Sequence, residues 1–180
     1  ADYNEGNPVA NGNSINLIKT ELQENPIAIA KVLTEGTEKI GYLMYNQFAR
    51  NFDSELNAVF ANFKAENISN LIVDLRYNPG GAVSTATYLG AMITGQYTGE
   101  LYSQEIWNKK VMKTSSPERF RNNFTDEIVN FDANGNLILQ ESINSLGLNK
   151  VYSIVTNATA SASELVINSL SSYIDVILVG

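Results

Sequence analysis

The chain has 180 residues, of which 44% are hydrophobic, so it is long enough to bury one sizeable core. Its net charge of -7 comes without a basic stripe that would neutralise phosphates, which argues against a nucleic-acid partner. It has no cysteine and no histidine, which excludes disulfides, thiolate metal sites and a Ser-His-Asp triad within the chain, and we expect neither a metal nor a cofactor.

The N-terminal third of the chain predicts a lead-in followed by a helix. Residues 1–13 are rich in Asn and Gly and carry a Pro, so we expect turns and mobility there. Short strands are expected at Asn16–Lys19 and Ile27–Leu33. Residues Asp53–Glu66 have the apolar spacing of a helix that covers a sheet, and we assign them no chemistry. The apolar positions of that helix are Leu56, Val59, Phe60 and Phe63.

The next segment is an apolar strand that ends in a glycine-rich turn. Residues Asn70–Ala82 predict a strand that ends in a turn, and a helix is expected near Val83–Ile93. Pro79 presets the first central φ of a β-turn, and Gly80 accepts a positive φ. Consecutive glycines also leave backbone amides open to a negative oxygen, so a turn and an anion site are compatible here.

Residues 94–150 are the least regular part of the chain. Alternation within Tyr97–Thr114 predicts an extended hairpin or flap, and Ser115–Asn123 is typical of a loop. Asn134-Gly135 predicts a hairpin turn between two apolar runs. The large aromatic residues here have two interpretations, a substrate groove or ordinary packing, and packing is the more common role. These residues are Tyr97, Tyr102, Trp107 and Phe120.

The last part of the chain predicts a buried strand, a sharp turn and a helix. Val151–Asn157 forms the strand, and Ser161 stands at the mouth of a helix that continues through Ser163–Ser172. A hydroxyl in front of the positive end of a helix dipole suits a nucleophile or the stabilisation of an oxyanion. Ser161 and Glu164 also match the capping box, in which a serine only satisfies backbone amides. This segment by itself leaves both interpretations open.

Three segments together resemble the carboxyl-terminal processing, or tail-specific, serine proteases. Asp74–Gly81 is the first motif, and Thr159–Glu164 follows about eighty residues later. Lys39–Tyr45 resembles the strand that opens the protease core in that family. The resemblance implies an α/β fold, namely a crotonase/ClpP-like protease core over residues 38–180 with helices packed on a β-sheet and an inserted mixed segment. Residues 1–37 would then be a lead-in, at most the exit from a preceding PDZ domain.

The resemblance also implies a mechanism built on a serine–lysine dyad. Ser161 would attack a peptide carbonyl, and the amide of Ala162, with that of Gly81 or Gly80, would hold the oxyanion. A buried neutral lysine would take the serine proton. In relatives that lysine follows the next strand, so we expect it roughly six residues past residue 180 and expect this chain to be inactive. Lys150 precedes the Ser161 strand and would lie roughly 20 Å from the hydroxyl.

The expected substrates are proteins or peptides with exposed, apolar, unstructured C-terminal tails. No apolar run approaches the length of a membrane span, and the family usually works in the bacterial envelope, either periplasmic or lipoprotein-anchored. Two other functions fit the same fold. One is a non-proteolytic module that binds peptides or apolar ligands, which the departure at Ser172 from the acidic residue of several relatives favours slightly. The other is a crotonase-type acyl-transfer enzyme, in which the serine motif would be coincidental. The oligomeric state is not indicated.

Overall fold

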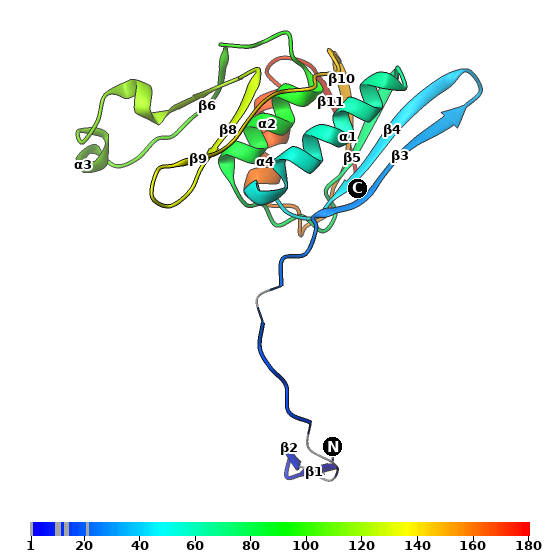
Figure 1. The fold of residues 1–180 in the computed structure, drawn as a ribbon, viewed down its shortest axis with the longest axis vertical. Coiled ribbons are helices and arrows are strands. Elements are labelled where there is room, and N and C mark those ends of the chain that lie inside the picture. The colour runs from blue at the N-terminus through cyan, green and yellow to red at the C-terminus, as the bar shows by residue number, and fades with distance from the viewer. Residues whose placement is uncertain (1, 10–11, 13–14, 21) are drawn as a thin grey trace.

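The computed structural model describes residues 2–9, 12, 15–20 and 22–180 and is organised around one mixed sheet (Figure 1). The sheet has five strands in the order β11-β10-β5-β4-β3. β3 and β4 form an antiparallel hairpin at one edge, and the other neighbours are parallel. The strands are β3 (Ile27–Glu35), β4 (Glu38–Tyr45), β5 (Asn70–Asp74), β10 (Lys150–Ile154) and β11 (Asp175–Val179).

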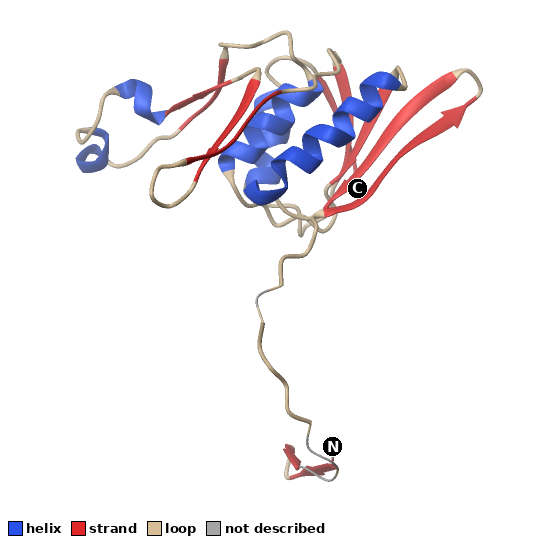
Figure 2. Cartoon of the chain, viewed as in Figure 1, coloured by secondary structure: helices blue, strands red, loops and turns tan. Residues whose placement is uncertain are grey.

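Three helices pack against the sheet, as Figure 2 shows. They are α1 (Asp53–Ala65), α2 (Val83–Ile93) and α4 (Ala162–Leu170). Alternate strand residues, such as Leu43 in β4 and Leu71 in β5, are fully buried in one hydrophobic cluster with residues of these helices. Alternation in the strands and a 3.6 period in the helices bring the two apolar surfaces together. The predicted α/β arrangement, with helices on a β-sheet, is confirmed.

The flap predicted over Tyr97–Thr114 has different boundaries in the structure. Only β6 (Leu101–Gln104) is a strand, and its partner is β7 (Arg121–Asn123), inside the segment predicted as a loop. Between them lie α3 (Lys109–Met112) and the 3-10 turn η2 (Pro117–Phe120). The Asn108 side chain caps α3 by accepting hydrogen bonds from the amides of residues 110 and 111, which ends the extended conformation there.

The hairpin predicted around Asn134-Gly135 is confirmed. β8 (Glu127–Phe131) and β9 (Leu137–Ser142) pair antiparallel on either side of the turn. The Asp132 carboxylate accepts hydrogen bonds from the backbone amides of Asn134 and Asn136, and Gly135 has a φ of +84°. A side chain that binds the amides of its own loop stabilises the turn locally.

Of the four aromatic residues considered for a groove, Tyr97, Tyr102 and Phe120 pack against other side chains, whereas Trp107 stays exposed. The Tyr102 ring is buried against Phe124, and its hydroxyl donates to the Ala86 carbonyl oxygen at 2.8 Å. Phe120 is buried as well. Trp107 is 54% exposed, in the excursion between β6 and β7.

The N-terminal segment differs from its prediction. β1 (Asp2–Asn4) and β2 (Asn7–Val9) form a small hairpin, while residues 1, 10, 11 and 13 of the expected turn-rich stretch lie outside the described residues. The strand predicted at Asn16–Lys19 is wrong, because this stretch is fully exposed and pairs with none of the described strands. A strand exists only where a neighbour takes up its backbone hydrogen bonds. Within the described part of the chain, no helix is both long and apolar enough to cross a membrane.

A buried carboxylate joins the helices to the β8–β9 hairpin. Asp53, at the start of α1, has no exposed surface. It accepts hydrogen bonds from the Thr85 hydroxyl of α2 and the Asn130 amide of β8, both at 2.7 Å. Burial raises the pKa of Asp53 above its ordinary value, and the two hydrogen bonds offset that rise only in part.

We expect this carboxylate to make stability depend on pH. Because folding raises the pKa of Asp53, the stabilisation it contributes is complete below its ordinary pKa of 3.8 and is lost as the pH rises through the raised value. The Asp53→Asn variant lacks this titration. In urea unfolding, the free energy of unfolding of wild type minus that of the variant should therefore be smaller at pH 7 than at pH 4. A difference between the two proteins that is the same at both pH values would contradict the assignment.

Candidate active site

The two sequence motifs meet at one edge of the sheet. β5 and β10 are parallel neighbours, with Val73 opposite Ser153 and Asp74 opposite Ile154. The carboxyl ends of parallel strands point to the same edge, so the loops that follow them emerge side by side. The segment around Gly80 and the segment around Ser161 are thereby brought together from positions far apart in the sequence.

Two threonine hydroxyls bind these loops to each other. The Thr156 hydroxyl donates to the carbonyl oxygen of Arg76 at 2.7 Å, and the Thr159 hydroxyl donates to that of Leu75 at 2.8 Å. The Thr159 hydroxyl oxygen also accepts from the Thr156 amide at 3.0 Å. The sequence analysis gave neither residue a role, although Thr159 opens the second motif. The only signal was their place in the turn after a buried strand, where small hydroxyl side chains often bind backbone.

Asn78 is the central hydrogen-bonding residue of the site and was likewise missed as a functional residue. It is fully buried, and its side-chain amide donates to the Tyr45 carbonyl oxygen at the end of β4 at 2.9 Å. Its side-chain oxygen accepts from the Gly80 amide at 2.9 Å. Its backbone carbonyl oxygen accepts from the Ala160 amide at 3.3 Å and from the Ser163 hydroxyl at 3.0 Å. One residue thus fixes the glycine turn against both β4 and the serine turn.

The two glycines lie where a side chain does not fit. A Cβ on Gly80, whose φ is +110°, would come within 2.7 Å of the Ser161 Cβ and 2.9 Å of the Ala162 nitrogen. A Cβ on Gly81 would collide with the carbonyl oxygen of Phe48, which accepts a hydrogen bond from the Ala82 amide. Close backbone approach, together with positive φ, requires glycine at both positions.

The backbone amides at this point differ in how they are used. The Gly80 amide is bound by the Asn78 side chain. Among the hydrogen bonds of the described residues, none uses the amides of Gly81 or Ala162. Of the donors predicted for an oxyanion, Gly80 is therefore occupied, while Gly81 and Ala162 remain open.

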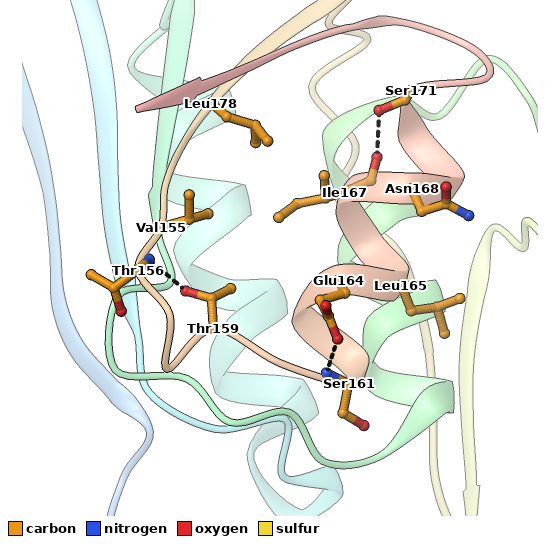
Figure 3. A pocket seen from close by; sticks show the side chains of 10 residues that line it. All are labelled: Val155, Thr156, Thr159, Ser161, Glu164, Leu165, Ile167, Asn168, Ser171 and Leu178. Carbon is orange, nitrogen blue, oxygen red and sulfur yellow. Dashed lines mark hydrogen bonds between the residues drawn. The ribbon is translucent and has the colours of Figure 1, made fainter. Parts of the chain in front are cut away.

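Ser161 has a backbone conformation that a capping serine does not need. Its φ of +57° and ψ of -115° place it far from the allowed regions for a residue with a side chain. The Glu164 carboxylate accepts a hydrogen bond from the Ser161 amide at 2.7 Å, which is one half of the capping box. Ser161 and Glu164 are thus placed as in a capping box, yet the serine hydroxyl makes no cap hydrogen bond that meets the usual geometry, and Figure 3 shows it pointing away from Glu164. Strain of this kind at an exposed hydroxyl is typical of a nucleophile held on a sharp strand-to-helix turn.

An open cleft of about 760 Å³ begins at Ser161 (Figure 3). It lies between α4 and the ends of β10 and β11, and its walls are largely apolar. The lining residues are Val155, Thr156, Thr159, Ser161, Glu164, Leu165, Ile167, Asn168, Ser171 and Leu178. None of these is a lysine, and Lys150 stands at the opposite end of β10 from the serine turn. The described residues also contain no group of acidic side chains that could hold a metal ion.

Charged and polar side chains fix the end of β5, where the first motif begins. Asp74, at the end of β5, accepts hydrogen bonds from the Arg76 guanidinium at 2.7 Å and from the Tyr42 hydroxyl at 2.6 Å. Burial acts to raise the pKa of Asp74, but these hydrogen bonds outweigh it and hold the pKa below its ordinary value. The carboxylate is therefore ionised at neutral pH and fixes the strand end from which the glycine turn departs.

Comparison with known proteins places the chain among peptidases. Residues 39–180 match the model of Peptidase family S41. A CtpA-like serine protease of Staphylococcus epidermidis is 25% identical over 96 residues, which are 53% of this chain and 20% of that protein. A structure from Bacteroides fragilis NCTC 9343, described as an S41 protease, superposes with a TM-score of 0.69 at 27% identity, over 87% of this chain and 39% of its own.

The photosystem II D1 C-terminal processing protease shares the fold, with a TM-score of 0.53 at 16% identity over 87% of this chain and 36% of its own. The protease-core fold predicted from the two motifs is confirmed by these similarities. The chain spans less than half the length of each of these relatives.

We expect Gly80→Ala to be more damaging than its positive φ alone explains. Gly99 has a φ of +90° but open space around its missing Cβ, so Gly99→Ala measures the backbone penalty by itself, about 1–2 kcal/mol. Gly80→Ala adds a collision with Ser161 and Ala162 and should lower the free energy of unfolding by about 1–3 kcal/mol more. Equal losses in urea unfolding of the two variants would show that the glycine turn and the serine turn are not in close contact.

Proposed function

Because the chain belongs to peptidase family S41, we propose that it forms the core of a serine peptidase in which Ser161 is the nucleophile. The observation that carries this proposal is the strained Ser161 turn beside two open amides, those of Gly81 and Ala162. A capping serine explains neither the strain nor the open amides. Neutral donors held in place in advance are the feature that stabilises an oxyanion.

The proposed reaction is acyl transfer to serine. The Ser161 oxygen attacks a peptide carbonyl carbon while its proton passes to a base. The amides of Gly81 and Ala162 hold the oxyanion, and the C–N bond then breaks as the leaving amine takes the proton. Water attacks the acyl-enzyme with the same base as proton acceptor, which releases the new carboxylate and regenerates the serine.

We assign the base to a lysine that is not among those of this chain. The chain has no histidine, and no lysine lines the cleft at Ser161. A lysine can serve as the base only where burial lowers its pKa. The 180 residues alone would then be inactive. As substrates we propose proteins with exposed, unstructured, apolar C-terminal tails, because the cleft beside Ser161 has apolar walls. We place the protein in the bacterial envelope by analogy with the family.

A second function is a binding module on the same fold. The absence of a lysine or histidine from the cleft lining favours it, since a serine without a base binds a peptide but does not cleave it. The two functions differ in covalent chemistry, so one experiment separates them.

The test uses a chain extended past residue 180 by the lysine-bearing segment, with a reporter protein that ends in an unstructured apolar tail. We expect the extended chain to cleave the reporter, and we expect its Ser161→Ala variant and the 180-residue form to be at least 1000-fold slower, because a triad or dyad acts as a unit. Cleavage is followed by gel electrophoresis and mass spectrometry of the products.

Tail binding without cleavage by any of the three proteins would reject the peptidase and support the binding module. Cleavage that survives Ser161→Ala would reject Ser161 as the nucleophile.

A further inference from the structure

The loop between β6 and β7 is the most basic part of the chain. Gln104 and Arg121 are register partners at its base, so we call residues 105–121 the basic loop. It carries five cationic side chains and two carboxylates, which gives it a net charge of +3, whereas the whole chain carries -7. The absence of a basic stripe, inferred from the total charge, therefore does not hold locally. The cations are Lys109, Lys110, Lys113, Arg119 and Arg121.

These five cations have no carboxylate partner in the described part of the chain. All of them are exposed, and the two ion pairs among the described residues lie elsewhere, between Lys39 and Glu66 and between Arg76 and Asp74. Like charges gathered in one loop repel one another, which costs free energy until an anionic surface approaches. The basic loop is therefore suited to a partner that carries many negative charges.

Two large apolar side chains are exposed beside the cations. Ile106 is 86% exposed and Trp107 is 54% exposed. The Trp107 indole nitrogen donates to the Glu105 carboxylate at 2.9 Å, and its backbone amide donates to the Met112 sulfur at 3.5 Å. These contacts hold the apolar pair against α3, which supplies two of the lysines. In Figure 1 the basic loop, with α3 in it, projects away from the sheet and its helices.

We propose that the basic loop docks on the surface of an anionic lipid bilayer. The lysine and arginine side chains bind headgroup phosphates, while the Trp107 ring and the Ile106 side chain enter the interfacial layer. A nucleic acid or an acidic peptide would engage the cations but leave Ile106 in water, so a bilayer is the partner that takes up both features. This inference does not depend on the reaction proposed for Ser161.

The charge distribution also sets the orientation of the docked protein. The total of -7 less the +3 of the basic loop leaves -10 on the other residues, so an anionic surface repels them while it attracts the loop. β6, from which the loop departs, packs against α4, and the Tyr173 hydroxyl donates to the Leu101 carbonyl oxygen at 2.5 Å. Because α4 begins directly after Ser161, docking holds the Ser161 turn at a fixed height above the bilayer.

The first test uses the 180-residue chain and its own fluorescence. Trp107 is the only tryptophan of the chain, so its emission reports on the basic loop alone. We expect vesicles of phosphatidylcholine mixed with phosphatidylglycerol to shift this emission to shorter wavelength, and brominated phospholipid to quench it, because the ring leaves water. Vesicles of phosphatidylcholine alone should have neither effect, and high salt should weaken both.

Three outcomes of this test would overturn the proposal. One is no sedimentation of the protein with the mixed vesicles. Another is sedimentation without a shift in the Trp107 emission, which would place the contact elsewhere on the chain. The third is an equal shift with both kinds of vesicle, which would remove the role of the cations.

The second test changes charge at constant total. One variant replaces three lysines of the basic loop by glutamine, and the control variant replaces three exposed lysines from other parts of the chain. The substitutions are Lys109→Gln, Lys110→Gln and Lys113→Gln in the first, and Lys19→Gln, Lys31→Gln and Lys64→Gln in the control. We expect binding to the mixed vesicles to weaken about a hundredfold in the first, at about fivefold for each cation, and by less than about twofold in the control. Equal losses in both variants would show that only the total charge matters.

The third test separates a bilayer from a soluble polyanion. Ile106→Ser removes an exposed side chain, so we expect an unchanged melting temperature, about tenfold weaker binding to the mixed vesicles and unchanged binding to polyglutamate. Polyglutamate that binds the unmutated chain as tightly as the vesicles do, together with vesicle binding that survives Ile106→Ser intact, would assign the loop to soluble polyanions and reject the bilayer.

Discussion

The geometry of the site depends on one buried amide side chain. Asn78 forms hydrogen bonds with the Tyr45 carbonyl at the end of β4, with the Gly80 amide and with the turn before α4. It thereby connects three segments that no other described residue connects. Because the residue is fully buried, each of these groups loses water on folding and needs the partner that Asn78 supplies. An apolar residue of the same size would leave the Tyr45 carbonyl and the Gly80 amide unsatisfied, at about 1–3 kcal/mol each.

The backbone amides near Ser161 fall into two groups, those bound by protein groups and those left open. Asn78 occupies the Gly80 amide and Glu164 occupies the Ser161 amide, so both of these donors are fixed by protein groups. The amides of Gly81 and Ala162, the next residues in each turn, have no hydrogen-bond partner among the described residues. In the proposed reaction the bound amides would hold the open ones in position, so that no reorganisation is needed when a negative oxygen arrives. Glu164 therefore acts on the site by binding the backbone amide of Ser161.

Much of this arrangement could be predicted from sequence because it follows from local patterns. The strand ending in Asp74, the helix over Asp53–Ala65 and the Asn134-Gly135 hairpin each have short-range signals, and their positions were right. The choice between Gly80 and Gly81 as an open donor could not be predicted, since it depends on the Asn78 side chain reaching a neighbouring amide. The β6–β7 pairing was missed for a similar reason, because a 3-10 turn and a capped helix separate the two strands and no alternation links them.

The parallel pairing of β5 with β10 has a consequence for the order of folding. It joins residues 80 positions apart, as in the contact between Ser153 and Val73, so the serine turn and the glycine turn cannot meet before most of the chain is available. Closing such a long loop is slow compared with forming the hairpins and helices between them. A growing chain on the ribosome consequently forms its helices before the Ser161 turn meets the glycine turn, so the site proposed for catalysis is assembled only as the sheet closes.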